Sequence, residues 1–135
     1  MKRAIALIDG EHYPNVVREA LEEVSASYDL RAAVFLGGTE KIDTALAGDA
    51  RQNEYGVPVF LHEDAQEAFN LAVSEHQPEV VVDLSDEPVL GYRERFRFAS
   101  YALAAGADYQ GADFTLSPPP FHELSEKPSV SIIGT

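Results

Sequence analysis

Apolar residues in this chain alternate between short continuous runs and helical periods. The runs RAIALID (residues 3–9) and LRAAVFLGG (residues 30–38), with glycine at or directly after their ends, are typical of buried parallel strands. Between them, apolar residues recur at helical spacing: Val16, Val17, Ala20, Leu21 and Val24. Pro14 suits the first turn of that helix, because an N–H there has no intrahelical partner to lose. The first 38 residues therefore predict strand, helix, strand.

The alternation continues through the rest of the chain. It predicts a weaker helix over residues 39–55 broken near Gly48, a short strand over 57–61, and a helix that Asp64 caps. A fourth strand over 80–84 follows, then a helix over 93–106 that ends at Gly106, then a short fifth strand over 111–116. This order predicts an α/β fold: a Rossmann-like open, mostly parallel sheet of about five strands with helices on both faces.

Three prolines divide the chain near its end. Pro118, Pro119 and Pro120 stop the fifth strand, and we expect one Rossmann-like α/β domain over residues 1–120. Residues 121–135 then give a linker and the start of another apolar strand, PSVSIIGT. Because that strand has no exit turn, we expect the chain to be cut from a longer protein.

Composition narrows the choice of partners. The chain carries 23 acidic against 10 basic residues, a formal charge of −13, which disfavours binding to nucleic acid. It has no cysteine, which excludes disulfides and zinc–sulfur sites. No apolar run approaches the ~20 residues that a membrane-spanning helix needs. We expect a cytoplasmic protein that binds neither nucleic acid nor membranes.

Polar residues gather where the predicted strands end, which is the edge at which parallel sheets bind ligands. In DGEH, the carboxylates of Asp9 and Glu11 are candidates for holding Mg²⁺, and His12 is a candidate for binding a phosphate or moving a proton. The alternative is structural: Gly10 makes a tight turn and the acids lie near the positive end of a helix dipole.

The segment FLGGTEK (residues 35–41) is a second candidate. Gly37 and Gly38 allow backbone N–H groups to face an anion, Thr39 offers a hydroxyl at a helix start, and Lys41 adds a positive charge. These residues are candidate phosphate ligands. The segment matches neither G-x-G-x-x-G nor a Walker A loop, so a tight turn with an N-cap is the alternative interpretation.

The fourth strand ends in DLSDEP (residues 83–88). Asp83 and Asp86 are candidates to complete a metal site with Asp9 and Glu11, although turn formers and caps often look the same. Arg93, Arg95 and Arg97 spread over different faces of a helix; we expect at least one in solvent and another within reach of a phosphate. His62, His76 and His122 show no metal-ligand spacing, and we expect most of them on the surface.

Four segments, in order, resemble the N-terminal part of the cyclic 2,3-diphosphoglycerate synthetase family: RAIALIDGEHYPNVVREAL, AVFLGGTEKI, YGVPV and YQGADFTLSPPP. The resemblance implies an ATP- and Mg²⁺-dependent ligase that closes a phosphoanhydride between the two phosphates of 2,3-diphosphoglycerate. It also implies that residues 128–135 open a P-loop nucleotide-binding domain whose ATP ligands lie beyond residue 135. On this interpretation the chain alone is inactive, and its partners are the substrate, the P-loop domain and a second copy in a homodimer.

Two other functions stay open at this point. LIDGEH also resembles the start of PIN-like NYN ribonuclease domains, with Asp9, Asp83 and Asp86 holding Mg²⁺. The acidic charge and the lack of a basic stripe disfavour that alternative. A regulatory small-molecule binding domain is the third, and within the ligase interpretation the domain either binds substrate or only supports the catalytic core.

Overall fold

A computed structural model describes residues 1–10, 12–36, 54–85, 92–112 and 114–119. Its helices and strands are β1 (Arg3–Ile8), α1 (Pro14–Ser27), β2 (Asp29–Phe35), β3 (Val59–Phe60), α3 (Ala65–His76), β4 (Val80–Asp83), α4 (Tyr92–Ala104), β5 (Asp108–Gln110) and β6 (Thr115–Leu116). The predicted α/β class is confirmed. The helix predicted over 39–55 falls almost wholly, and the strand predicted near the end of the chain entirely, outside the described residues.

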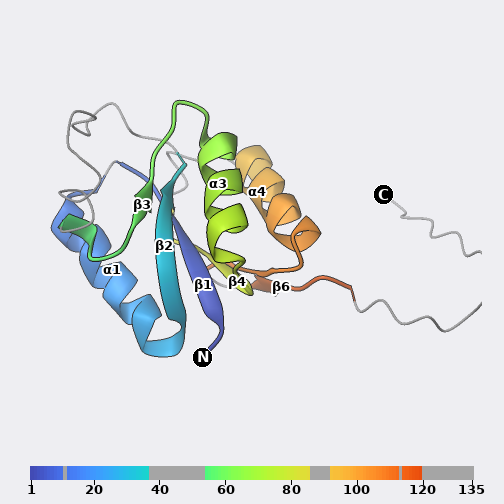
Figure 1. The fold of residues 1–135 in the computed structure, drawn as a ribbon, viewed down its shortest axis with the longest axis horizontal. Coiled ribbons are helices and arrows are strands. Elements are labelled where there is room, and N and C mark those ends of the chain that lie inside the picture. Colours follow the sequence, from blue (N-terminus) through green and yellow to red (C-terminus); the bar gives the residue numbers. More distant parts are fainter. Residues whose placement is uncertain (11, 37–53, 86–91, 113, 120–135) are drawn as a thin grey trace, which may run out of the picture.

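The six described strands form one sheet in the order β3-β2-β1-β4-β5-β6 (Figure 1). All neighbouring pairs are parallel except β5 and β6, which are antiparallel. The chain moves outward from β1 through β2 to β3, then returns to place β4 on the other side of β1. The strand order therefore reverses at the boundary between β1 and β4. In open α/β sheets the crevice at such a reversal is the usual ligand site.

Helices cover both faces of the sheet, as predicted (Figure 1). On one face α1 packs Val17 and Leu21 against Ile8 and Phe35. On the other face α3 and α4 form a larger cluster with Phe69 and Phe98. Residues 4–8 of β1 and 80–82 of β4 are buried and covered on both faces of the sheet, which explains why these stretches are continuously apolar.

The helix ends predicted from sequence are confirmed. Pro14 occupies the first turn of α1. The Asp64 side chain accepts a hydrogen bond from the backbone N–H of Gln66 at 2.9 Å, which caps α3. Gly106 follows α4 with a φ of +83°, a conformation that glycine adopts without strain.

The strand predicted over residues 111–116 is confirmed only at Thr115–Leu116, and its predicted start is wrong. The chain instead makes β5 before this segment and β6 at its end, and the two strands form a hairpin in which Gly111 N–H donates to the Phe114 carbonyl at 2.8 Å. Gly111 thus belongs to the turn. Tyr109 is the only apolar residue of β5, so no apolar run marked that strand. The third strand is also shorter than predicted, with two residues.

Among the described residues, no helix is long and apolar enough to cross a membrane.

Candidate functional site

The ends of β1 and β4 lie next to each other at the carboxyl edge of the sheet. Leu7 on β1 is paired with Asp83 on β4, and the backbone N–H of Leu84 donates to the Leu7 carbonyl at 2.8 Å. Asp9 follows two residues after Leu7, and both aspartates are buried, at 2% and 9% exposure. Two buried acidic residues from distant parts of the sequence therefore lie at neighbouring strand ends where the strand order reverses, at the sheet edge that the sequence predicted.

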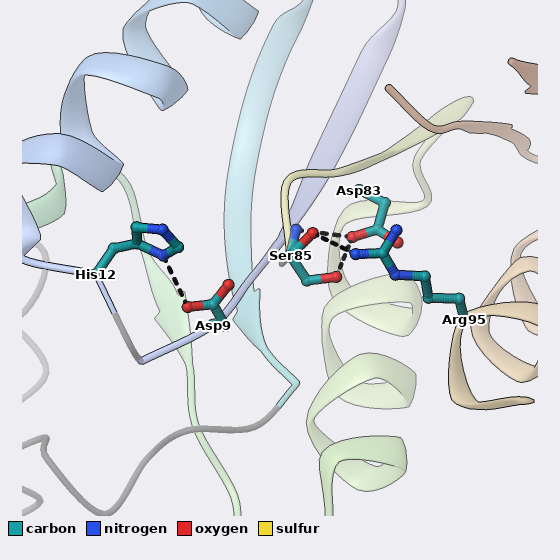
Figure 2. Close-up of polar contacts among 5 residues, drawn as sticks. All are labelled: Asp9, His12, Asp83, Ser85 and Arg95. Carbon is teal, nitrogen blue, oxygen red and sulfur yellow. Dashed lines mark hydrogen bonds and ion pairs between the residues drawn. The ribbon is translucent and has the colours of Figure 1, made fainter. Parts of the chain in front are cut away.

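Asp9 holds His12 beside this boundary (Figure 2). The Nδ1 atom of His12 lies 3.0 Å from Oδ1 of Asp9, whose side chain is almost fully buried while the imidazole is about half exposed. A small cavity of about 90 Å³ adjoins the pair and is lined by Ile8, Asp9, His12, Val17, Ala20 and Leu84. A half-exposed imidazole oriented by a buried carboxylate is suited to contacting an anion or transferring a proton.

Asp83 is held by three hydrogen-bond donors. Its Oδ1 accepts from the backbone N–H of Ser85 at 2.8 Å and from the Ser85 hydroxyl, and its Oδ2 accepts from the Tyr109 hydroxyl on β5. Burial raises the pKa of Tyr109, and the hydrogen bond to Asp83 and the negative charge of Asp83 raise it further, whereas the nearby charge of Arg95 acts in the opposite direction. Tyr109 therefore stays protonated and remains a donor to Asp83.

Arg95 reaches the same strand end from α4. Its Nη2 donates to the Ser85 carbonyl at 2.8 Å, so the turn after β4 is held by Asp83 on one side and by Arg95 on the other (Figure 2). Arg93 and Arg97 are exposed, which confirms that at least one of the three arginines lies in solvent. Arg95 is half-buried and is the member of the set that faces the candidate site.

Sequence reasoning missed Tyr109 and Ser85. Tyr109 stands alone as an apolar residue between polar neighbours, and Ser85 looked like one more turn residue in DLSDEP. Ser85 contacts Asp83 within one local turn, two residues away. The role of Tyr109 depends on the pairing of β4 with β5, in which Val81 lies beside Tyr109. No signal in the local sequence reports that pairing.

The remaining candidate residues divide into two groups. Asp9, His12 and Asp83 are described, and lie as above. The others lie outside the described residues: Glu11, Gly37, Gly38, Thr39, Lys41 and Asp86. Among the described residues, no group of three or more His, Asp or Glu side chains is arranged to hold a metal ion. The metal and phosphate sites therefore stay predictions.

The other histidines serve the fold. His62 is exposed, as expected, and its Nδ1 accepts from the backbone N–H of Asp64 at 3.0 Å. His76 is half-buried rather than on the surface, because its ring packs edge-on against Phe60 at 5.7 Å. His122 is outside the described residues.

Comparison with known proteins agrees with the resemblance drawn from the sequence. The family model described as "Cyclic 2,3-diphosphoglycerate synthetase, N-terminal domain" matches residues 3–117. The chain is 50% identical to the cyclic 2,3-diphosphoglycerate synthetase of Rubrobacter xylanophilus over 135 residues, 98% of this chain and 29% of that protein. It is 48% identical to the synthetase of Thermococcus kodakarensis, over 97% of this chain and 29% of that protein. With the synthetase of Methanothermus fervidus it shares 41% identity, over 99% of this chain and 30% of that protein.

These relatives carry one name, and the chain spans less than a third of their length. Nothing in these matches supports the ribonuclease or regulatory alternatives. A family match over residues 3–117 places nearly all of the described fold, including Asp9, His12, Asp83, Arg95 and Tyr109, inside the matched region. The chain therefore belongs to the family of cyclic 2,3-diphosphoglycerate synthetase N-terminal domains.

Proposed function

We propose that this chain is the N-terminal domain of an ATP-dependent ligase that forms cyclic 2,3-diphosphoglycerate, and that its β1–β4 boundary helps to hold the phosphates of 2,3-diphosphoglycerate. The observation that carries the proposal is the reversal of strand order between β1 and β4, with Asp9, His12 and Asp83 at the strand ends. The names and lengths of the relatives support the same activity in a longer protein.

The reaction requires two anionic phosphates of one molecule to be brought together. The γ-phosphoryl group of ATP is transferred to an oxygen of one substrate phosphate, which breaks its bond to ADP. An oxygen of the other substrate phosphate then attacks the activated phosphorus, closes the ring and expels inorganic phosphate. Repulsion between the two phosphates has to be offset by donors and positive charges placed around them.

This domain has candidate donors for that task in an otherwise acidic chain. We propose that His12, the backbone of Gly37 and Gly38, the Thr39 hydroxyl and the Lys41 ammonium contact the substrate phosphates. Asp9 orients His12 through the 3.0 Å contact between their side chains. Because the chain's formal charge is −13, a phosphate can be held only where such local donors outweigh the overall field.

The full-length enzyme would also use ATP and Mg²⁺. Mg²⁺ would neutralise phosphate charge, and its candidate ligands in this chain are Asp9, Glu11, Asp83 and Asp86. Three donors already occupy the oxygens of Asp83, which makes that carboxylate a poor cation ligand. We propose no ATP ligand within this chain, which would therefore be inactive alone.

Titration of the full-length protein with 2,3-diphosphoglycerate tests this proposal. Lys41→Ala and His12→Asn should each weaken binding of the substrate and lower turnover, since each removes a donor to a phosphate. Lys2→Ala is a control, because Lys2 lies at the opposite edge of the sheet beside Asp108. Affinity and turnover unchanged in both site variants would reduce this domain to a support for the catalytic core.

A further inference from the structure

Arg95 is a positive group at the β4 end of the site whose own interactions in the fold are few. One N–H of its guanidinium, on Nη2, donates to the Ser85 carbonyl. Its Nε is buried and has no hydrogen-bond acceptor within the described part of the chain. No carboxylate in the described part of the chain lies within ion-pair distance of Arg95, although the sequence has 23 acidic residues and only 10 basic ones.

Burying the Arg95 Nε–H without an acceptor costs folding free energy. A buried N–H of a charged group loses its hydration, and the loss is offset only when an acceptor replaces the water. Arg95 as a whole is only half-buried, however, so part of the residue remains exposed to solvent. A planar guanidinium with unused donors is the group best suited to a phosphate, which accepts two parallel hydrogen bonds.

The position of Arg95 complements that of His12. Figure 2 shows the His12 ring on the side of α1 and the Arg95 side chain reaching from α4 toward Ser85, with the ends of β1 and β4 between them. The carboxylate of Asp83 lies near Arg95, but it is satisfied by Ser85 and Tyr109. Among the described residues, no carboxylate therefore neutralises the charge of Arg95 directly, and that charge can serve a ligand.

We propose that Arg95 binds one phosphate group of the ligand at the β1–β4 boundary, on the opposite side from His12. This inference rests on the proposed function and deepens it: a substrate with two phosphates would meet one positive group from each helical layer. Arg93 and Arg97, on the same helix but exposed, take no part in binding.

Calorimetric titration of the full-length protein with 2,3-diphosphoglycerate tests the inference. Arg95→Gln should weaken binding by about tenfold or more, the usual effect of removing a charge-assisted hydrogen bond, and Arg95→Lys should weaken it less. Arg93→Gln, the matched control, should bind as the wild type does. Equal affinities for the wild type and Arg95→Gln would overturn this inference. A wild type that does not bind 2,3-diphosphoglycerate would overturn the proposed function itself.

Two further measurements separate ligand contact from support of the turn. Titration with 2-phosphoglycerate and 3-phosphoglycerate removes one phosphate at a time. If Arg95 contacts one phosphate, Arg95→Gln should affect binding of only one of these two ligands, whereas a structural role would weaken both equally and overturn the inference. If Arg95→Gln does not fold, the Nε–Hε resonance of Arg95 in the wild type should shift on addition of 2,3-diphosphoglycerate. An unshifted resonance at saturation would also overturn it.

Discussion

The hydroxyl of Tyr109 on β5 donates a hydrogen bond to Oδ2 of Asp83 at the end of β4, across 26 residues of sequence. Both residues are buried, so neither group can exchange its partner for bulk water. This hydrogen bond ties the last parallel strand of the sheet to the strand end at which the candidate site lies. Its contribution can be measured because the donor and the ring of Tyr109 can be separated by substitution.

Tyr109→Phe should lower the free energy of unfolding by about 1–3 kcal/mol, because a buried carboxylate oxygen loses its donor while the ring packing is kept. Urea unfolding followed by circular dichroism measures the change. Tyr101→Phe is the matched control, since Tyr101 packs against Phe69 and Phe98 through its ring and has no hydroxyl hydrogen bond among the described residues. Equal losses in the two variants would contradict the role given to the Tyr109 hydroxyl.

The raised pKa of Tyr109 predicts that the stability of the fold decreases at alkaline pH. The folded protein raises the pKa of Tyr109 above the ordinary value of about 10, mainly by burial and then through Asp83. The folded state therefore keeps this proton after the unfolded state has lost it. The resulting stability is complete below about pH 10 and is lost as the pH rises toward the folded value.

Unfolding free energies of the wild type and Tyr109→Phe, measured between about pH 9 and about pH 11, test this dependence. The difference between the two proteins should shrink as the pH rises, because only the wild type has the phenol to ionise. A difference that is constant over this range would mean that Tyr109 titrates like an exposed tyrosine.

A side chain at Gly111 is predicted to displace the half-exposed ring of Phe114. A Cβ at Gly111 would lie 2.8 Å from Cε1 of the Phe114 ring, which itself packs 6.0 Å from the ring of Tyr109. Gly111→Ala should therefore lower the free energy of unfolding by about 1 kcal/mol, the low end for overpacking, because the half-exposed ring of Phe114 can move aside. In the Phe114→Ala background the same substitution should cost much less, and a double-mutant cycle measures the coupling. Additive effects would contradict the steric explanation.

Asp9→Asn should change the tautomer of His12. An ionised carboxylate only accepts hydrogen bonds, so the 3.0 Å contact places the hydrogen on Nδ1 in the neutral ring, whereas an amide can donate as well as accept. Long-range ¹H–¹⁵N spectra of the imidazole report which nitrogen carries the hydrogen, and the His12→Gln spectrum assigns the signal. Glu19→Gln, an exposed change on α1, is the control and should leave the signal unmoved. An identical tautomer ratio in the wild type and Asp9→Asn would contradict the orienting role of Asp9.

The sequence predicted those elements whose burial leaves a continuous or periodic apolar signal. β1, β2, β4 and the three described helices carry such signals, and Pro14, Asp64 and Gly106 mark helix ends through local chemistry. β5 and β6 carry none, since the pairing of Tyr109 with Leu116 is decided by the hairpin and by the neighbouring strand. Local sequence cannot report a strand of three residues that owes its place to its partners.

The candidate site was predictable to the same extent. Parallel strands end at a common edge, which correctly placed Asp9 and Asp83 at the ends of neighbouring strands. The donor Tyr109 depends on the pairing of β4 with β5. The choice of Arg95 rather than Arg93 or Arg97 depends on how α4 lies against the sheet. That arrangement follows from packing among Phe69, Phe98 and their neighbours, a property of the assembled core rather than of any single segment.

The reversal of strand order also divides the molecule into two pieces that are each continuous in sequence: β1 to β3 come from the first 60 residues, and β4 to β6 from residues 80 to 116. Within the sheet, the backbone hydrogen bonds between β1 and β4 join the two pieces. A ligand bound at this boundary would contact both pieces at once. Its binding would therefore raise the free energy needed for either half of the domain to unfold locally without the other.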